Sequence, residues 1–545
     1  IENSGQINIL PMLNMYVPGI FVTERNSLGF GVSTGSAGSI IVRGISGSPN
    51  TGVLILVDGH PQYQGIFGHP LPDSYVATDL DKVEVIRGPA SILYGTNAMA
   101  GVINLITRKN EKPQWNGSLG ASYGSYNTHK VFGTIGYKNK KWDIFASINN
   151  DKTDGIRYNT DFRITNGYTK IGYTINDKLN VVADINIADF VANDNGTIYI
   201  PKPFGIDISR GKTSFSLYNK FSKSEGAIKI YHNFGTHDLS DGWHSTDRNS
   251  GLMVYQTIKP FKGNTLTVGT DFKQYGGKAN SGVAKDQLKT VNEIAGYIYT
   301  QQILQEKLMV SAGLRLENNS NFGNQWVPSA GIAYNPTSFT TFKGVVSKGF
   351  RSPTIMEMYL FAPNSALMPE KMLNYEISWL QRFLNNKIRF ELTGYIINGD
   401  DMIQVVGAFP NVKRQNVGKF SNKGIELSFN YKPTAEFQLF GNYSYLHQDV
   451  KTLAAPRQQI NLYANYSYKK WSLNGGFQYI EKLCTKLTPE TAEYYLLANT
   501  RLSFIPAKGI TFFLSGNNLF DEKYEINYGY PMPGFNFIGG INVKF

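Results

Sequence analysis

An alternation of apolar and polar residues with a period of two runs through most of this 545-residue chain and constrains its fold more than any other feature. The alternation is clear in residues 142–148, 388–396 and 471–479. A period of two places successive side chains on opposite faces of a β-strand. Because the pattern begins after Pro113 and continues to Phe545, the sequence predicts about 430 residues of consecutive strands.

The strands can belong to a membrane barrel or to a soluble β-protein. No apolar run approaches the roughly 18 residues of a membrane-spanning helix, which excludes a helical membrane protein. A membrane β-barrel fits, because its alternating strands need only about 10 residues each. Aromatic residues at strand ends, such as Trp142 and Trp471, and the short polar turns at residues 138–141 and 385–387 favour it. A soluble sandwich, propeller or solenoid is the alternative, but the sequence lacks a repeat at propeller or solenoid spacing.

The length predicts the size of the barrel and a second domain. About 430 residues at about 20 per strand give roughly 20 to 22 strands, a size at which the lumen of a barrel is plugged. The first part of the chain differs, with a short helical pattern at residues 7–15, a Gly/Ser-rich stretch at 29–52 and a compact strand at 53–57. We expect a small α+β plug domain over residues 1–112 and a mainly β, about 22-stranded antiparallel transmembrane barrel over residues 113–545.

Composition narrows the function classes. The formal net charge is +12, and the first 110 residues contain about 7 acidic and about 6 basic residues, so the positive excess belongs to the barrel. This excess is either spread over solvated loops or forms a mouth that attracts anionic ligands. The basic residues are dispersed among strands, which argues against nucleic-acid binding. The single cysteine, Cys484, excludes a disulfide framework and a multi-cysteine metal site.

Enzyme signatures are weak. Gly31, Ser33 and Gly35 match a G-x-S-x-G pattern, but they lie in a Gly/Ser-rich stretch with no strand-to-helix elbow. The sequence contains no P-loop, HExxH motif or EF-hand loop. We therefore expect that the chain is not an enzyme.

Several motifs resemble the TonB-dependent outer-membrane transporter family, and together they span nearly the whole chain. In the expected plug they are residues 13–20, 40–44, 53–59 and 81–107. In the expected barrel they are residues 349–359, 367–376, 422–426, 517–524 and 540–545. The resemblance implies a plugged barrel in the outer membrane of a Gram-negative bacterium.

The resemblance also implies active uptake of a scarce ligand. Its expected partners are the TonB–ExbB–ExbD energising complex, outer-membrane lipid and a small-molecule metal chelate. Whether a surface lipoprotein hands over the ligand stays open. The family's energy-coupling box is not visible before Gly5, and neither is a signal peptide. We interpret the missing box as a truncation or a flexible end before Ile1, and a protein without the box would not be expected to carry out energised transport. Whether a signal peptide precedes Ile1 stays open.

In the family, two plug arginines lie beside two barrel glutamates. The matching positions are Arg43 and Arg87 with Glu376 and Glu426. Charges buried inside a plugged lumen need partners, and partnered charges can fix the plug while leaving it releasable. We expect a plug–barrel charge cluster at these positions, and ordinary surface charges are the alternative.

Ligand contacts are expected in the apical plug loop and in an outer barrel loop. The apical candidates are His60, Gln62, Tyr63, Gln64, Phe67 and His69. The outer-loop candidates are His237, Asp238, Asp241, His244 and Asp247. Histidines near aromatic side chains can hold a haem iron, a metal chelate or a flat macrocycle, and ordinary loop histidines are the alternative.

The cargo stays open among iron chelates, cobalamin and, more remotely, copper. The haem branch of the family often places a histidine in the region that matches residues 354–364, where this chain has none. A positive mouth suits an anionic ferric siderophore, and residues 97–104 resemble the vitamin B12 transporter branch. We expect an importer of a ferric siderophore or haem with no cofactor of its own. The alternatives are a cobalamin or copper importer, a passive porin, and an all-β surface binding protein such as a lectin or adhesin.

Overall fold

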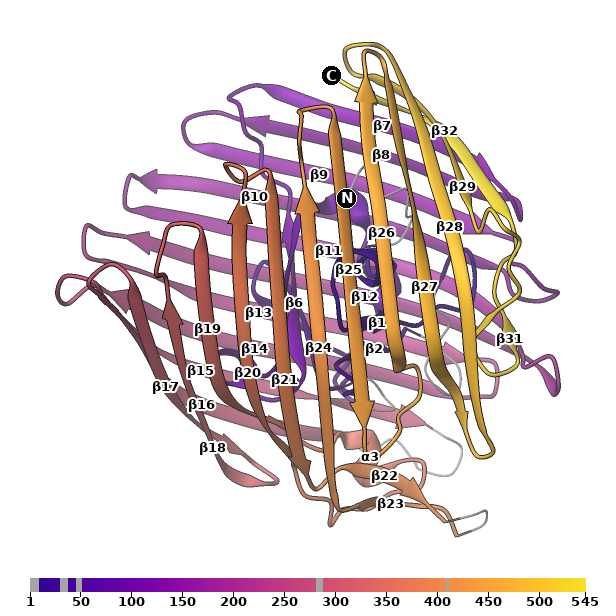
Figure 1. Cartoon of the computed structure of the whole chain (residues 1–545). Helices are drawn as coiled ribbons and strands as arrows, with labels where there is room; N and C mark the ends of the chain where they lie inside the picture. The colour runs from indigo at the N-terminus through magenta and orange to yellow at the C-terminus, as the bar shows by residue number, and fades with distance from the viewer. Residues whose placement is uncertain (1–8, 30–37, 46–50, 281–287, 408–410) are drawn as a thin grey trace.

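The computed structural model describes residues 9–29, 38–45, 51–280, 288–407 and 411–545. A closed barrel of 22 antiparallel strands surrounds an N-terminal plug (Figure 1). The barrel strands follow chain order, and the last strand pairs with the first. The predicted fold class, a barrel of about 22 strands around a plug, is confirmed.

The barrel strands are β7 (Trp115–Gly124), β8 (Thr128–Lys138), β9 (Trp142–Thr153), β10 (Phe162–Asn176), β11 (Leu179–Gly196), β12 (Pro201–Lys220), β13 (Ser224–Leu239), β14 (His244–Ile258), β15 (Asn264–Asn280), β16 (Lys289–Leu304), β17 (Leu308–Asn319), β18 (Gly323–Tyr334), β19 (Thr340–Arg351), β20 (Glu370–Phe383), β21 (Ile388–Asp400), β24 (Lys419–Tyr431), β25 (Phe437–Gln448), β26 (Pro456–Tyr468), β27 (Trp471–Leu487), β28 (Glu490–Ala507), β29 (Ile510–Asn517) and β32 (Asn536–Lys544). The connecting loops add α3 (Ile355–Tyr359), β22 (Ile403–Val406), β23 (Lys413–Asn416), β30 (Glu525–Asn527) and β31 (Tyr530–Pro531).

The alternation in the sequence separates an apolar exterior from a mixed interior. On β16, Ile294 and Ile298 face outward and are exposed, whereas Glu293 and Tyr297 point into the lumen and are buried. An apolar outer band over a polar lumen is typical of outer-membrane barrels. None of the helices in the described ranges is long and apolar enough to cross a membrane.

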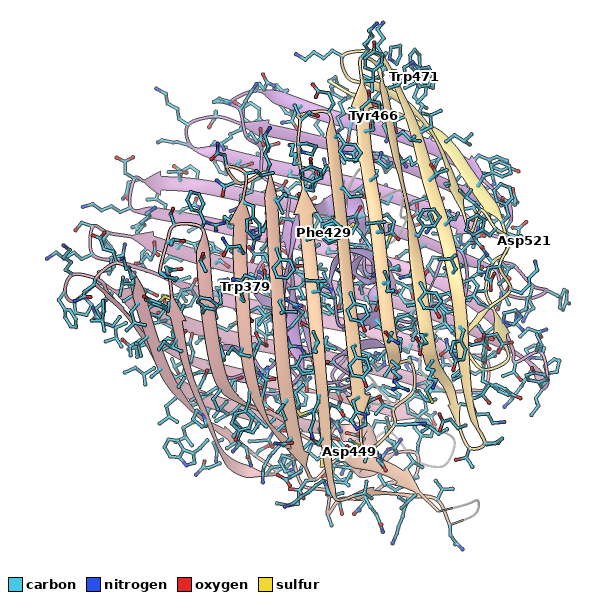
Figure 2. All side chains as sticks on the ribbon, viewed as in Figure 1. Trp379, Phe429, Asp449, Tyr466, Trp471 and Asp521 are labelled. Carbon is cyan, nitrogen blue, oxygen red and sulfur yellow. The ribbon has the colours of Figure 1, made fainter. Side chains whose placement is uncertain are left out.

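The two ends of the barrel differ in the length of their connections. At one end the turns are short, as at residues 139–141, 177–178 and 469–470. The other end has long connections, residues 352–369, 401–418 and 518–535. Figure 2 shows Trp471 near the first end and Asp449 at the opposite one. Because such barrels have short periplasmic turns and longer extracellular loops, the end with long connections is the outer end.

The plug consists of α1 (Pro11–Tyr16), β1 (Ile20–Val22), β2 (Ile40–Val42), β3 (Val53–Val57), β4 (His60–Gln62), η1 (Pro72–Ser74), η2 (Ala77–Asp79), β5 (Leu80–Arg87), α2 (Ser91–Tyr94) and β6 (Gly101–Thr107). Its main sheet has four strands in the order β4-β3-β6-β5, and β3 pairs with β6 in parallel. The predicted strand at residues 53–57 is β3, and all five of its side chains are buried. A continuous apolar run is what a strand covered on both faces needs.

The predicted domain boundary lies in the segment that joins plug and barrel. The last plug strand ends at Thr107 and the first barrel strand begins at Trp115. The predicted helix near the start is α1, which begins at Pro11. The G-x-S-x-G match at residues 31–35 and the segment before Gly5, where no energy-coupling box is visible, lie outside the described residues.

Candidate functional site

Four charged side chains link the plug to one wall of the barrel. The Arg43 guanidinium donates through Nε to Glu426 Oε1 and through Nη2 to Glu426 Oε2, both at 2.9 Å. Its Nη1 donates to Glu376 Oε2 at 2.6 Å. Arg87 donates to the second carboxylate oxygen of Glu426. We call Arg43, Arg87, Glu376 and Glu426 the charge clamp, and the structure brings all four predicted residues together.

The local backbone places Arg43 for this contact. Arg43 follows β2 in a turn with φ of +53°, a left-handed conformation that is uncommon for residues other than glycine. Gly19 faces it, and a Cβ there would lie 2.1 Å from Glu426 Oε1, so only glycine fits. The Val-Pro-Gly turn at residues 17–19, part of one segment that resembles the family, therefore leaves space for the Glu426 carboxylate.

The clamp keeps its charges although it is buried. Burial alone would lower the pKa of Arg43, but the charges of Glu426 and Glu376 outweigh burial and raise that pKa above its ordinary value. The guanidinium also stacks on the Tyr395 ring, 4.2 Å from its centroid. Removing one partner from such a buried pair typically costs about 3–5 kcal/mol, because the other charge is left uncompensated.

On the same wall, side-chain amides of the barrel donate hydrogen bonds to the backbone of the plug. Asn422 donates to the carbonyl oxygen of Arg43 at 3.0 Å, and Asn442 donates to that of Met15 at 2.7 Å. Gln459 and Asn461 both donate to the carbonyl oxygen of Asn14, at 2.5 and 3.0 Å. Sequence patterns do not single out these amides, because an inward polar residue of a barrel strand looks the same whether it meets water or a plug.

His60 lies inside the interface and not at the outer face. It is 1% exposed, and its Nδ1 and Nε2 lie 3.0 Å from the Val57 carbonyl oxygen and 3.1 Å from Ser216 Oγ. Burial lowers its pKa to about 4, and the positive charges of Lys212 and Lys229 act in the same direction. In this conformation His60 is a neutral, hydrogen-bonded residue that a ligand at the mouth does not reach.

The next three apical candidates are also buried. The Gln62 amide donates to the carbonyl oxygen of His60, and the Tyr63 ring packs edge-on against Tyr275 with centroids 5.6 Å apart. The Gln64 side-chain oxygen accepts from the backbone N–H groups of Ile66 and Phe67. These contacts shape the loop, and Phe67 and His69 are the two apical candidates that are half-buried and not fully buried.

The half-buried Phe67 and His69 pack at the mouth with two aromatic barrel residues, the buried Trp243 and the exposed Phe361. The Phe67 ring lies 5.7 Å from His69 and 5.9 Å from Trp243, and Trp243 lies 5.1 Å from Phe361. Phe361 is 54% exposed. Burial lowers the pKa of His69, and its Nδ1 lies 2.7 Å from the Pro70 carbonyl oxygen. Phe67, His69, Trp243 and Phe361 are called the outer mouth below.

A tether holds the apical loop in place. Asp247 of β14 accepts from the backbone N–H of Gly65 at 2.8 Å and pairs with Arg210 of β12. A Cβ on Gly65 would lie 2.4 Å from the Arg248 carbonyl oxygen, so glycine allows the loop to reach the wall. The predicted outer-loop residue Asp247 therefore binds the plug, and the loop is fixed before any ligand arrives.

The other outer-loop candidates divide between the interior and the rim. His237 is buried and close enough to His69 to interact electrostatically. Asp241 accepts from the Trp243 backbone N–H at 3.0 Å, which shapes the turn below the mouth. His244 and Asp238 pair on exposed strand ends. The structure thus brings His69 and His237 together and leaves His244 apart at the rim.

A second buried arginine explains the motif at residues 349–370. Arg351 pairs with Glu357 at 2.8 Å and with Glu370 at 2.6 Å. Thr354 and Glu357 form a reciprocal capping box that begins α3. This network fixes the loop that carries Phe361 to the mouth. The motif residues are visible in the sequence, but their pairing depends on the closed loop.

A further ionic cluster lies on β15–β17. Arg315 pairs with both Asp271 and Glu317 at 2.6 Å. Lys273 donates to the carbonyl oxygen of Tyr94 at 2.9 Å. This cluster holds the plug turn after α2, so buried ions contact the plug on more than one side.

A polar cavity of about 50 Å³ lies between the plug and part of the wall formed by β10–β13, which the plug also contacts directly, as in the Asn233 bond to the Pro61 carbonyl oxygen. Its lining includes Gln64, Tyr63 and Asn233, and each of these has a side-chain polar atom with no hydrogen-bond partner among the described residues. A polar cavity of this size has room for a few water molecules. We expect water to complete these hydrogen bonds.

The described residues contain no group of three or more His, Cys, Asp or Glu side chains that could hold a metal ion. The site offers a ligand the aromatic side chains of the outer mouth. Near them, the Lys289 ammonium group lies 4.8 Å from the centroid of the Tyr359 ring.

The closed barrel, its apolar exterior and its charge-clamped plug define the class of plugged outer-membrane receptors. A family model described as the TonB-dependent receptor plug domain matches residues 1–102, and one described as the TonB-dependent receptor-like β-barrel matches residues 96–519. The chain belongs to the TonB-dependent receptor family. This family consists of receptors and transporters, not enzymes, and it places the chain in the outer membrane.

Relatives with known names are distant but cover almost the whole chain. The iron-regulated outer membrane virulence protein of Vibrio cholerae is 24% identical over 97% of this chain and 88% of its own length. The vitamin B12 transporter BtuB of Vibrio vulnificus is 22% identical over 99% of this chain and 90% of its own.

Solved structures share the fold. The siderophore receptor PirA of Pseudomonas aeruginosa superposes with a TM-score of 0.80 at 17% identity, covering 100% of this chain and 97% of PirA. The ferric enterobactin receptor PfeA of the same species, crystallised as a mutant with enterobactin, superposes with a TM-score of 0.83 at 15% identity, covering 99% and 97%.

Proposed function

We propose that this chain is a TonB-dependent transporter that imports an iron-containing chelate of the ferric siderophore type across the outer membrane. The observation that carries the proposal is the outer mouth, where Phe67 and His69 of the plug meet Trp243 and Phe361 of the barrel. A ligand there touches plug and barrel at once, so its binding can be signalled to the plug. The siderophore receptors among the structural neighbours and the iron-regulated relative support this choice.

The proposed mechanism uses the clamp as a releasable lock. The ligand binds against aromatic rings, which give flat apolar contact area, and nearby cations such as Lys289 attract an anionic chelate. Energy delivered from the inner membrane through the TonB–ExbB–ExbD complex then rearranges the plug. The buried arginine–glutamate pairs hold the plug in place between transport cycles, because separating a pair leaves both charges without a partner.

The ligand-binding roles follow from accessibility. Phe67 and His69 are the proposed apical contacts, and Phe361 is the proposed barrel contact. His60, Gln62, Tyr63 and Gln64 are proposed to act by shaping the loop beneath the ligand. A surface lipoprotein partner and the exposed His244 at the rim are proposed only to deliver the ligand to the mouth.

The first experiment measures ligand affinity with purified protein in detergent. A ferric catecholate, a ferric hydroxamate, haem and cyanocobalamin are each titrated by calorimetry against the wild type and against Phe361→Ala and His69→Ala. We expect a ferric chelate to bind and each variant to weaken binding at least tenfold, about 1.4 kcal/mol. His129→Ala is the matched control, because His129 lies on β8 away from the mouth.

The result that would overturn the proposal is affinity for cyanocobalamin alone, which would make the chain a cobalamin transporter, as the BtuB relative suggests. Uptake of radioactive iron by a deletion strain, with and without the energising complex, tests transport itself. Conductance of the intact chain in a planar bilayer tests the plug, because a constitutively open pore would identify a passive porin.

A further inference from the structure

A pocket of about 380 Å³ lies between α1 of the plug and the barrel strands β24–β29. Its lining includes Asn430 near the end of β24, Gln438 near the start of β25 and Asn474 near the start of β27. These positions adjoin the short turns that join the strands. Figure 2 shows Trp471, the first residue of β27, at this end of the barrel. The pocket therefore lies at the inner, periplasmic end, and we call it the inner pocket.

Strand register places polar side chains of four neighbouring strands in one row of the inner pocket. Gln438 of β25 pairs with Asn465 of β26, which pairs with Asn474 of β27. Asn474 in turn pairs with Arg501 of β28. Neighbouring strands lie about 4.8 Å apart, so the row presents three amides and one guanidinium at that spacing.

Several of these polar groups are available to a ligand. The side chains of Asn430, Gln438 and Asn474 are half-buried and have no hydrogen-bond partner among the described residues. The Tyr463 hydroxyl, from a side chain that is 8% exposed, also has no partner within the described part of the chain. Each amide offers two donors and an acceptor oxygen. A ligand rich in hydroxyl and amide groups would pair with them.

Three aromatic rings add an apolar surface to the same pocket. Tyr16 of α1 packs against Phe440, with ring centroids 5.5 Å apart, and against Tyr463, with ring centroids 5.9 Å apart. A Cβ on Gly476 would lie 2.3 Å from Tyr463 Cδ1, so glycine leaves space for that ring. Aromatic faces beside free amides suit a ligand with one flat apolar face and a polar rim, as a sugar ring has.

The inner pocket also contains a positive charge at one end of its polar row. Among the described residues that line the pocket, Arg501 is the one with a charged side chain. Its guanidinium lies 3.7 Å from the centroid of the Phe513 ring and donates to Ser515 Oγ at 3.4 Å. Because an arginine binds a carboxylate through charge-assisted hydrogen bonds, this end of the pocket favours a ligand with one carboxylate.

The closed barrel makes an extended peptide a poor ligand for this pocket. Peptides that bind by backbone hydrogen bonds add a strand to a free sheet edge. Each of the strands β24–β29 that line the pocket already pairs with a neighbour on both sides. The pocket therefore offers a ligand side chains and not backbone, which favours a sugar over an extended peptide.

We propose that the inner pocket binds an N-acetylated amino-sugar disaccharide that carries one carboxylate, a unit of the cell-wall glycan in the periplasm. A sugar ring stacks on the aromatic surface, the free amides bond its hydroxyl and acetamido groups, and Arg501 pairs with the carboxylate. The site is separate from the outer mouth, because it lies at the other end of the barrel. Since α1 and the barrel wall both line it, the bound sugar links plug and barrel.

The test measures binding by calorimetry with the full chain in lauryldimethylamine oxide, a detergent without a sugar headgroup. The probe is N-acetylglucosaminyl-N-acetylmuramic acid. Three comparison ligands lack one feature each: diacetylchitobiose has no carboxylate, cellobiose has no acetamido group, and tri-alanine has no sugar. The variants are Gln438→Ala, Asn474→Ala and Arg501→Gln. Gln301→Ala is the matched control, because Gln301 is a half-buried amide near the inner end of β16, on the lumen face that it shares with Tyr297.

We expect the probe to bind, Gln438→Ala and Asn474→Ala each to weaken binding at least fivefold, and the control to stay within twofold of the wild type. Arg501→Gln should remove the preference for the probe over diacetylchitobiose. No binding at concentrations up to about 10 mM would overturn the proposal. So would equal affinity in all variants, or tighter binding of tri-alanine. If Arg501→Gln does not fold, the two amide variants decide, because they remove half-buried groups without partners among the described residues.

Discussion

The plug meets two walls of the barrel that differ in chemistry. The wall formed by β20, β21, β24, β25 and β26, here the clamp wall, contacts it through the charge clamp and through amides bound to its backbone. The wall formed by β10–β13, here the cavity wall, faces it across the polar cavity. In Figure 1 the clamp wall passes in front of the indigo plug and the cavity wall passes behind it.

Apolar contacts reach both walls, because plug residues Leu28 and Leu71 pack in a buried cluster with side chains of β10–β12. The largest buried cluster of the plug includes Met372, Tyr395, Ile397 and Phe420, all from the clamp wall. On the cavity wall, contacts such as Asn233 to the Pro61 carbonyl oxygen lie beside space that water can enter. Water can replace a hydrogen bond broken beside the cavity, whereas breaking the charge clamp leaves a buried charge without its partner. We therefore expect the plug to separate first from the cavity wall and to stay anchored at the clamp wall.

The largest effect is expected from Arg43→Ala, which leaves the buried Glu426 carboxylate without its bidentate partner. We expect a loss of about 3–5 kcal/mol in the stability of the docked plug. Calorimetry in detergent measures it, and limited proteolysis reports release of the plug. Arg389→Ala is the control, since this arginine on β21 is 58% exposed. Equal losses in both variants would contradict the role of the clamp.

The second effect is the pH dependence that His60 contributes at the cavity wall. The pKa of His60 is about 4 in the folded protein and about 6.5 when unfolded, so the unfolded chain takes up the proton first on acidification. The contribution of His60 to stability is therefore full above about pH 6.5 and falls as the pH approaches 4, by up to about 3 kcal/mol. Protonation also places a third positive charge beside Lys212 and Lys229.

Hydrogen exchange between pH 7 and pH 5 tests this. We expect exchange to rise around residues 60–64 and to change little around residues 40–45, which lie against the clamp. In His60→Gln the dependence on pH should flatten. An equal rise at both segments would mean that acid acts on the plug as a whole and not on one wall.

The third effect compares two matched amides. Asn442→Ala removes the donor to the Met15 carbonyl oxygen at a buried position of the clamp wall, and we expect it to cost about 1–3 kcal/mol. Asn233→Ala removes the donor to the Pro61 carbonyl oxygen beside the cavity, and we expect it to cost under about 1 kcal/mol because water replaces the amide. Thermal unfolding of both variants decides, and equal costs would erase the difference between the walls.

The sequence predicts the barrel well because membrane embedding imposes a simple rule. Each strand must present apolar residues to lipid at every second position, so the pattern survives without any knowledge of pairing. The plug is predicted from local motifs, such as the apolar run that became β3. The clamp positions follow from a family resemblance, since nothing in the local sequence around Arg43 indicates that Glu426 lies beside it.

The proposed ligand contacts are harder to predict because their exposure depends on distant contacts. His60 and His69 look alike in the sequence, yet Ser216 of β12 binds the first and the second reaches the mouth. The tether from Gly65 to Asp247 joins residues 182 positions apart. Sequence patterns identify residue types suited to binding, but the folded barrel decides which of them a ligand can touch.

The smallest effect is expected where the plug contacts neither wall. Lys82 and Glu84 of β5 form an exposed pair at 2.6 Å, and Lys82 lowers the pKa of Glu84 by a hydrogen bond. Exposed pairs contribute little, because solvent screens them and two long side chains must be ordered. We expect Glu84→Gln to change the unfolding free energy by no more than about 0.5 kcal/mol. This variant sets the baseline for both walls. A loss as large as that of Asn442→Ala would show that plug stability is distributed over the whole domain, and the distinction between the two walls would then carry no information about how the plug moves.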